Sequence, residues 1–120
     1  MSEVAEFLKP IPGENPSGEN LYYAPLMKEV EEAAREEEEL GQGVWKREIK
    51  KADYKAVVKL TTKALKEKTK DLFLAAYLCE AWARMDGLEG VLRGLELARG
   101  LLEGFWDTIY PEIEDGDAEF

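Results

Sequence analysis

The chain has 120 residues, and its 16 Lys and Arg against 26 Asp and Glu leave a formal net charge of −10. It has no histidine and a single cysteine, Cys79, which excludes histidine-based catalytic triads, histidine-ligated metals and a disulfide within the chain. The length is that of one domain, and an apolar fraction of 45% is enough for a hydrophobic core.

The sequence carries no targeting or membrane signal. Its longest apolar run, residues 72–79, is far shorter than the roughly 20 residues that span a bilayer. The N-terminus lacks the basic start and apolar stretch of a secretory signal. We therefore expect a cytoplasmic protein without membrane insertion, and the lone cysteine agrees with this.

The first third of the chain predicts two helices joined by a loop. A short helix through Leu8 is capped by Ser2 and ended by Pro10, and residues 10–20 form a loop rich in Pro and Gly. A second helix is predicted over residues 21–40, with Pro25 in its first turn. Gly41 and Gly43 would end it. Its apolar face holds Tyr23, Leu26, Met27, Val30, Ala33 and Ala34.

The middle of the chain predicts two helices with strong end signals. Asp53 and Asp71 are good N-caps, and Gly87 is a good C-cap. The helix after Asp53 has an apolar face opposite a lysine face, which places it on the surface of the core. The helix after Asp71 is apolar almost all round, which is typical of a central helix.

The fifth predicted helix runs from Leu88 to Tyr110. Its main apolar stripe, which we expect to face the core, contains Leu88, Val91, Leu92, Leu95, Leu102, Trp106, Ile109 and Tyr110. The chain shows no alternating strand pattern. The fold class is therefore all-α: an antiparallel helical bundle of about five helices with a Pro/Gly-rich N-terminal loop, in one domain covering residues 1–120.

Four glycines interrupt the fifth helix, and each costs roughly 1 kcal/mol relative to alanine. Gly90 and Gly94 stack on one side, as do Gly100 and Gly104, and such pairs let another backbone approach closely. The same broad side carries Leu97, Leu101 and Phe105. Two interpretations are open: close packing within the bundle, or docking of another chain, including a two-fold homo-oligomer.

Charge is segregated along the chain. Residues 46–70 hold ten basic and three acidic residues, a local balance of +7. This segment is either a solvated lysine face or a steering surface for an acidic partner. Nucleic-acid binding is not expected, because the lysines lack interleaved aromatic residues and the whole chain is acidic.

No catalytic or metal-binding set is recognisable. Consecutive acids at 36–39 radiate around a helix, and the Asp115-Gly116-Asp117 stretch is too short for a calcium loop. Cys79 lies on an apolar face and is expected to be core packing. We therefore expect no enzyme, no metal and no cofactor.

Four stretches in order resemble a known family. The first is Leu8-Lys9-Pro10-Ile11 with Asn15-Pro16-Ser17-Gly18-Glu19-Asn20-Leu21, and the second is Trp45 with Lys51-Ala52-Asp53-Tyr54. The third is Thr69-Lys70-Asp71-Leu72 with Ala75-Ala76-Tyr77-Leu78. The fourth is Gly87-Leu88-Glu89-Gly90-Val91 with Gly94-Leu95, then Phe105-Trp106-Asp107-Thr108-Ile109-Tyr110-Pro111 and Glu114-Asp115-Gly116-Asp117. The chain resembles the N-terminal domain of the ImpA/TssA family of type VI secretion components. It departs from the family pattern at Asn20, Tyr54 and Phe73, where an acid, Trp and a basic residue are common.

The resemblance implies a cytoplasmic, non-enzymatic scaffold domain that contacts baseplate, tube or sheath components. It also implies that the chain is the front part of a longer protein. The alternative is a generic helical adaptor or dimerisation module unrelated to secretion. Trp106 and Tyr110 are either docking residues or core anchors. The candidate protein-binding residues are Gly90, Gly94, Leu97, Leu101, Phe105, Trp106, Asp107, Tyr110, Asp115 and Asp117.

Overall fold

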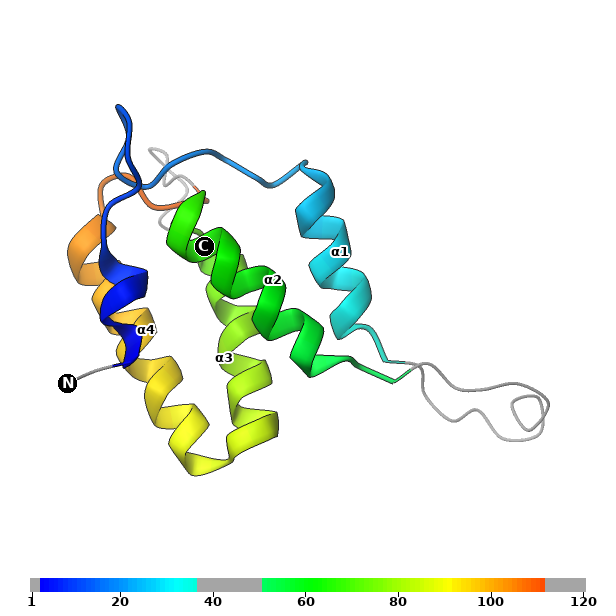
Figure 1. Cartoon of the computed structure of the whole chain (residues 1–120). Helices are drawn as coiled ribbons and strands as arrows, with labels where there is room; N and C mark the ends of the chain where they lie inside the picture. Colours follow the sequence, from blue (N-terminus) through cyan, green and yellow to red (C-terminus); the bar gives the residue numbers. More distant parts are fainter. Residues whose placement is uncertain (1–2, 37–50, 112–120) are drawn as a thin grey trace, which may run out of the picture.

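Helices make up all the regular structure that the computed structural model describes, which covers residues 3–36 and 51–111 (Figure 1). A 3-10 helix, η1, spans Glu3–Leu8. Four α-helices follow: α1 (Pro25–Ala34), α2 (Tyr54–Glu67), α3 (Leu72–Asp86) and α4 (Leu88–Phe105). The described ranges contain no strand, only isolated bridges of Gly18 to Thr69 and of Asp71 to Tyr110. The all-α prediction is confirmed for these ranges, where the predicted bundle of about five helices consists of four α-helices and one 3-10 helix.

The three end signals of the middle helices are confirmed. The Asp53 carboxylate accepts the Ala56 N–H at 3.1 Å. The Asp71 carboxylate accepts the N–H groups of Phe73 and Leu74 at 2.7 and 3.1 Å. Gly87, at φ +64°, reverses the chain between α3 and α4, a backbone conformation that glycine adopts without steric cost.

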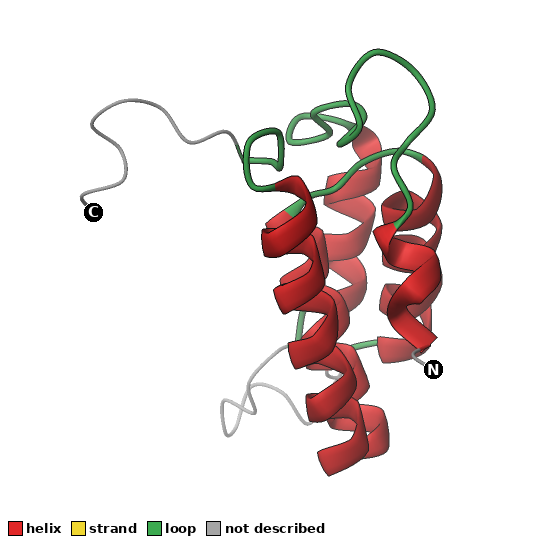
Figure 2. Cartoon of the chain, turned by 90° about the vertical axis from the view of Figure 1, so that its left-hand side faces the viewer, coloured by secondary structure: helices red, strands yellow, loops and turns green. Residues whose placement is uncertain are grey.

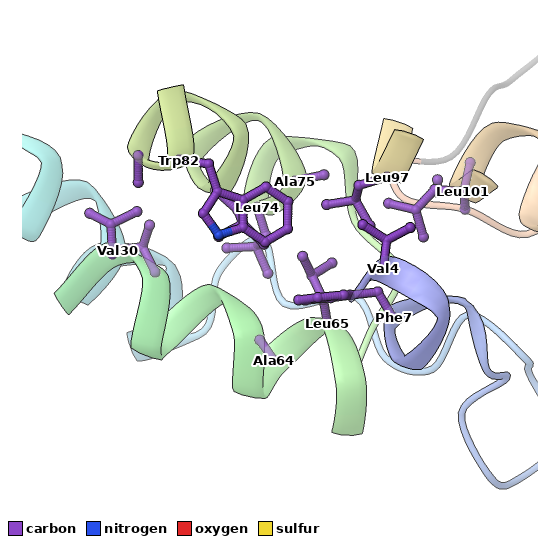
Figure 3. Packing of buried hydrophobic residues seen from close by; sticks show 14 of the residues in the cluster. Val4, Phe7, Val30, Ala64, Leu65, Leu74, Ala75, Trp82, Leu97 and Leu101 are labelled. Atoms are coloured by element: carbon purple, nitrogen blue, oxygen red, sulfur yellow. The ribbon is translucent and has the colours of Figure 1, made fainter. Parts of the chain in front are cut away.

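The helix α3 is the centre of the core, as its all-round apolar character predicts. It packs against α4, α2 and α1. Its buried residues are Leu74, Ala75, Leu78, Ala81 and Trp82. Figure 3 shows η1 closing one side of this core, where the Phe7 ring meets the Trp82 ring edge to face with centroids 5.7 Å apart.

The predicted second helix is shorter than the sequence pattern indicates. It begins at Pro25, and Ala24 before it is extended at ψ 153°, as a residue preceding proline prefers. Tyr23 therefore lies outside the helix and is 89% exposed, so its predicted place on the buried face is wrong. At the other end Arg35 is already extended. The predicted signals at Ser2, Gly41 and Gly43 lie outside the described residues.

The predicted fifth helix also ends early, at Phe105 instead of Tyr110. The N–H groups of Thr108 and Ile109 both turn back to the Phe105 carbonyl, at 2.9 and 2.7 Å. Tyr110 instead donates its N–H to the Lys70 carbonyl at 2.9 Å and accepts the Leu72 N–H at 2.7 Å. The helix stops because this segment bonds to the α2–α3 connection.

Candidate protein-interaction surface

The side of α4 that carries Gly90 and Gly94 faces the core. Gly90, Gly94, Leu97, Leu101 and Phe105 are all buried. A Cβ atom at Gly90 would overlap the carbonyl of Trp82, and one at Gly94 would lie 3.0 Å from the Cys79 Sγ. These glycines therefore allow α3 and α4 to cross closely, which is the first of the two interpretations of the glycine pattern.

The second glycine pair is less uniform. At Gly100 an added Cβ would meet the Leu8 side chain of η1 at 2.6 Å. At Gly104 nothing lies within 4 Å. Three of the four α4 glycines are thus covered by this chain itself, which leaves little of the stacked small-residue faces for the two-fold pairing considered from sequence.

The α4 residues of the predicted main stripe face outward, so the prediction that this stripe faces the core is wrong. Leu95 is 62% exposed and Trp106 57% exposed. We call this surface the α4 outer stripe, and it consists of Leu88, Val91, Leu92, Leu95, Leu102 and Trp106. In Figure 2, α4 lies at the front of the molecule, and no other helix is in front of it. Of the predicted stripe, only Ile109 and Tyr110 are buried, and both lie beyond the helix end.

The ten candidate residues fall into three groups. Trp106 and Asp107 are exposed. Asp115 and Asp117 lie outside the described residues. The remaining six are buried in the domain; they are Gly90, Gly94, Leu97, Leu101, Phe105 and Tyr110. The outer stripe was missed as a surface, although the helical cost of the four α4 glycines was a signal that the side carrying them, opposite the stripe, is the one packed within the domain.

Charged side chains border the α4 outer stripe on one edge. Glu89, Glu96 and Glu103 are exposed and recur every seven residues. Arg99 lies within the stripe between Leu95 and Leu102, and its Nε is 2.9 Å from the Glu103 carboxylate. Leu92, Leu95, Glu96 and Arg99 line a shallow depression in the surface. The stripe is therefore an apolar ridge with one cation in its middle and an acidic edge.

Aromatic residues form a second, smaller exposed group near the start of α1. The Tyr22 and Tyr23 rings meet edge to face with centroids 4.7 Å apart, and the Phe73 ring lies 6.1 Å from that of Tyr22. All three are exposed. The exposed lysines of α2 are separate from both groups; they are Lys55, Lys59, Lys63 and Lys66.

A buried lysine, Lys70, joins η1, α2 and the end of α4. Lys70 is fully buried, and its ammonium donates to the carbonyls of Phe7 and Leu65 at 2.6 and 2.7 Å. It lies 5.3 Å from the centroid of the Phe105 ring. Burial lowers the pKa of Lys70 to about 8, because an apolar environment disfavours the charged form.

The Asn15–Gly18 turn is fastened to the segment after α4. Ser17 and Thr108 share a hydroxyl hydrogen bond of 2.7 Å. The Tyr110 hydroxyl donates to the Gly18 carbonyl at 3.0 Å and accepts from the Asn15 amide at 3.2 Å. Motif residues far apart in the sequence thus meet in one polar cluster, and their role here is to hold the fold together.

Residues 3–36 and 51–111 contain no group of three or more His, Cys, Asp or Glu side chains that could hold a metal ion. Cys79 is half-buried and packs against the core, as predicted, and burial raises its pKa. A thiol of this kind is a poor nucleophile. Among the described helices, none has the length and apolar character needed to cross a membrane.

Comparison with known proteins decides the family. The family described as ImpA, N-terminal, type VI secretion system matches residues 8–120. The chain belongs to the ImpA N-terminal family. It is 30% identical over 117 residues to the type VI secretion system component TssA1 of Pseudomonas aeruginosa, covering 98% of this chain and 34% of that protein.

A solved structure extends the similarity to three dimensions. It is the N-terminal domain, including the conserved ImpA_N region, of the TssA component from Burkholderia cenocepacia. The ImpA_N chain described here is 35% identical to it, with a TM-score of 0.81, over 98% of this chain and 42% of that chain. The family resemblance read from the four motif stretches is confirmed.

Proposed function

We propose that this domain is a non-enzymatic protein-interaction module of a TssA-type assembly factor, acting in the cytoplasm. Its α4 outer stripe would contact a baseplate, tube or sheath component of the type VI secretion system. The observation that carries the proposal is the exposure of six large apolar side chains along one helix of a chain with a net charge of −10.

The physical argument rests on the cost of leaving such a surface in water. A contiguous apolar ridge with a polar border is typical of protein-binding surfaces, whereas scattered exposed apolar residues are ordinary. Burying one leucine side chain is worth roughly 1.5–3 kcal/mol. Trp106 adds the type of residue that most often dominates binding energy.

The surface continues beyond the helix. Asp107 is exposed next to Trp106, and we include it with Asp115 and Asp117 on the basis of the sequence. Among the six buried candidates, Gly90 and Gly94 lie against Trp82 and Cys79 and so set the spacing between α4 and α3. Membership of the ImpA N-terminal family and similarity to TssA1 support a secretion partner over an adaptor unrelated to secretion.

The experiment measures binding of the purified domain to individually purified baseplate, tube and sheath proteins. Leu95→Glu and Trp106→Glu should abolish binding to at least one of them, with unchanged circular dichroism. Tyr23→Ser, which removes an even more exposed aromatic ring elsewhere, is the control and should bind normally. If both α4 variants bind like the unmodified domain, the assignment of the α4 outer stripe is wrong.

A further inference from the structure

The apolar ridge on α4 has the spacing of a helix-pairing seam. Its positions follow one another at intervals of four, three, four, three and four residues: Leu88, Leu92, Leu95, Arg99, Leu102 and Trp106. With such a 3.5-residue repeat, all six positions lie within about 80° of arc around the helix axis, in a band that runs along the helix. Trp106 keeps helical dihedral angles, at φ −49° and ψ −42°, so the band continues to the C-cap.

The shape of the ridge favours one kind of occupant. It is straight, narrow and about 27 Å long at roughly 1.5 Å per residue. A second helix lying alongside α4 would cover its whole length, with side chains of each helix fitting between those of the other.

The charges beside the ridge indicate which residues the approaching helix should carry along its edge. Glu89, Glu96 and Glu103 are seven residues apart and lie on the same side of the seam. The opposite side carries Val91 and the small, half-buried Ala98. An approaching helix with Lys or Arg along the glutamate side would be complementary, and one with acids there would be repelled.

The same charges argue against a second copy of this chain. A two-fold antiparallel pair of α4 helices would oppose Glu96 to Glu96 and Glu89 to Glu103. A parallel pair in register would oppose Arg99 to Arg99 in the middle of the seam. Both arrangements place like charges together, which is unfavourable in helix pairs.

We infer that the α4 outer stripe binds an amphipathic helix of another protein, with an apolar seam at 3.5-residue spacing and basic residues along one edge. An acidic residue near the middle of that seam would pair with Arg99, whose side chain is exposed and now bonded to Glu103. This inference rests on the proposed function and adds the chemistry of the partner.

The test uses two synthetic helical peptides in calorimetric titrations of the domain. Both have a leucine seam with one central glutamate; one carries lysines and the other glutamates along the edge. We expect the domain to bind the lysine-edge peptide at least ~10-fold more tightly at low salt. The triple variant Glu89→Lys, Glu96→Lys, Glu103→Lys should reverse this preference. Leu95→Glu should weaken both peptides, and Tyr23→Ser neither.

Several results would overturn the inference. They are equal affinity for the two peptides, a preference that the triple variant leaves unchanged, failure of the lysine-edge peptide to bind, or a dimer in sedimentation that Leu95→Glu dissociates. The proposed function is tested separately from this inference. If Leu95→Glu abolishes binding to a secretion component while the peptides show no charge preference, the surface is right and the partner chemistry is wrong.

Discussion

Gly90 of α4 lies against the main-chain carbonyl of Trp82 in α3, with no space for a Cβ atom between them. Gly90→Ala therefore forces the two helices apart and should lower the free energy of unfolding by about 1–3 kcal/mol. Gly104→Ala is the matched control, because its position is open. There alanine should be neutral or stabilising by up to about 1 kcal/mol. Urea unfolding of both variants checks this, and equal stabilities would contradict the close crossing.

The orientation of α4 can be tested by placing one charge on each face. Leu97 is fully buried and Leu95 is largely exposed, two residues apart in the same helix. Leu97→Glu should unfold the domain, because it buries a carboxylate among core leucines. Leu95→Glu should change the free energy of unfolding by less than about 0.5 kcal/mol. Thermal melts of the two variants measure this difference. If Leu95→Glu were the more destabilising variant, the face predicted from the sequence pattern would be the buried one.

Lys70 is expected to stabilise the junction of η1, α2 and the segment after α4. Lys70→Met keeps the volume and removes the donor, so the carbonyls of Phe7 and Leu65 lose their hydrogen bonds with the ammonium. Each unpaired buried polar group costs roughly 1–3 kcal/mol. Lys63→Met, on the exposed face of α2, should have little effect. Chemical denaturation compares the two variants, and a Lys70 variant as stable as the Lys63 variant would show that the Lys70 ammonium is dispensable.

The lowered pKa of Lys70 also predicts a pH dependence. In the folded domain this pKa is about 8, against an ordinary value of 10.5. Between these values the unfolded chain binds a proton that the folded chain does not, so stability rises with pH. The contribution is complete above 10.5 and is lost as pH falls through 8. The difference in unfolding free energy between the unmodified domain and Lys70→Met should change across this range; a constant difference would contradict the pKa assignment.

Two buried threonines should respond differently to valine. Among the described residues, the Thr69 hydroxyl is buried without a hydrogen-bond partner, whereas the Thr61 hydroxyl donates to the Val57 carbonyl at 2.7 Å. Thr69→Val should be neutral or stabilising by about 1 kcal/mol, because it removes an unsatisfied polar group. Thr61→Val loses a bond and should be neutral at best. Calorimetric melting temperatures test the order of the two variants.

Local signals in the sequence predicted the helix boundaries of the middle of the chain well. Asp53, Asp71 and Gly87 end or begin helices through interactions with their immediate neighbours, so sequence alone contains the relevant information. The all-α class and the central position of α3 follow in the same way from apolar periodicity.

The orientation of α4 was not predictable from hydrophobicity alone. The helix has two apolar faces, and a helical wheel predicts burial of the face with the larger side chains. The structure buries the other, because Gly90 and Gly94 let α3 approach more closely than leucines would allow. The polar cluster around Lys70 and Tyr110 was also missed, since its hydrogen bonds join residues such as Ser17 and Thr108 that are 91 positions apart.

Because α4 buries its glycine side and exposes its outer stripe, one face of the helix stabilises the fold and the other is left for binding. Substitutions at Gly90, Gly94, Leu97 and Leu101 would be penalised in a screen for expression or protease resistance. Substitutions at Leu88, Leu92, Leu95 and Leu102 would pass that screen and be penalised only where a binding partner is needed for growth or secretion. Selection would therefore act on the two faces of α4 independently. The exposed face could change together with a binding partner while the domain stays folded.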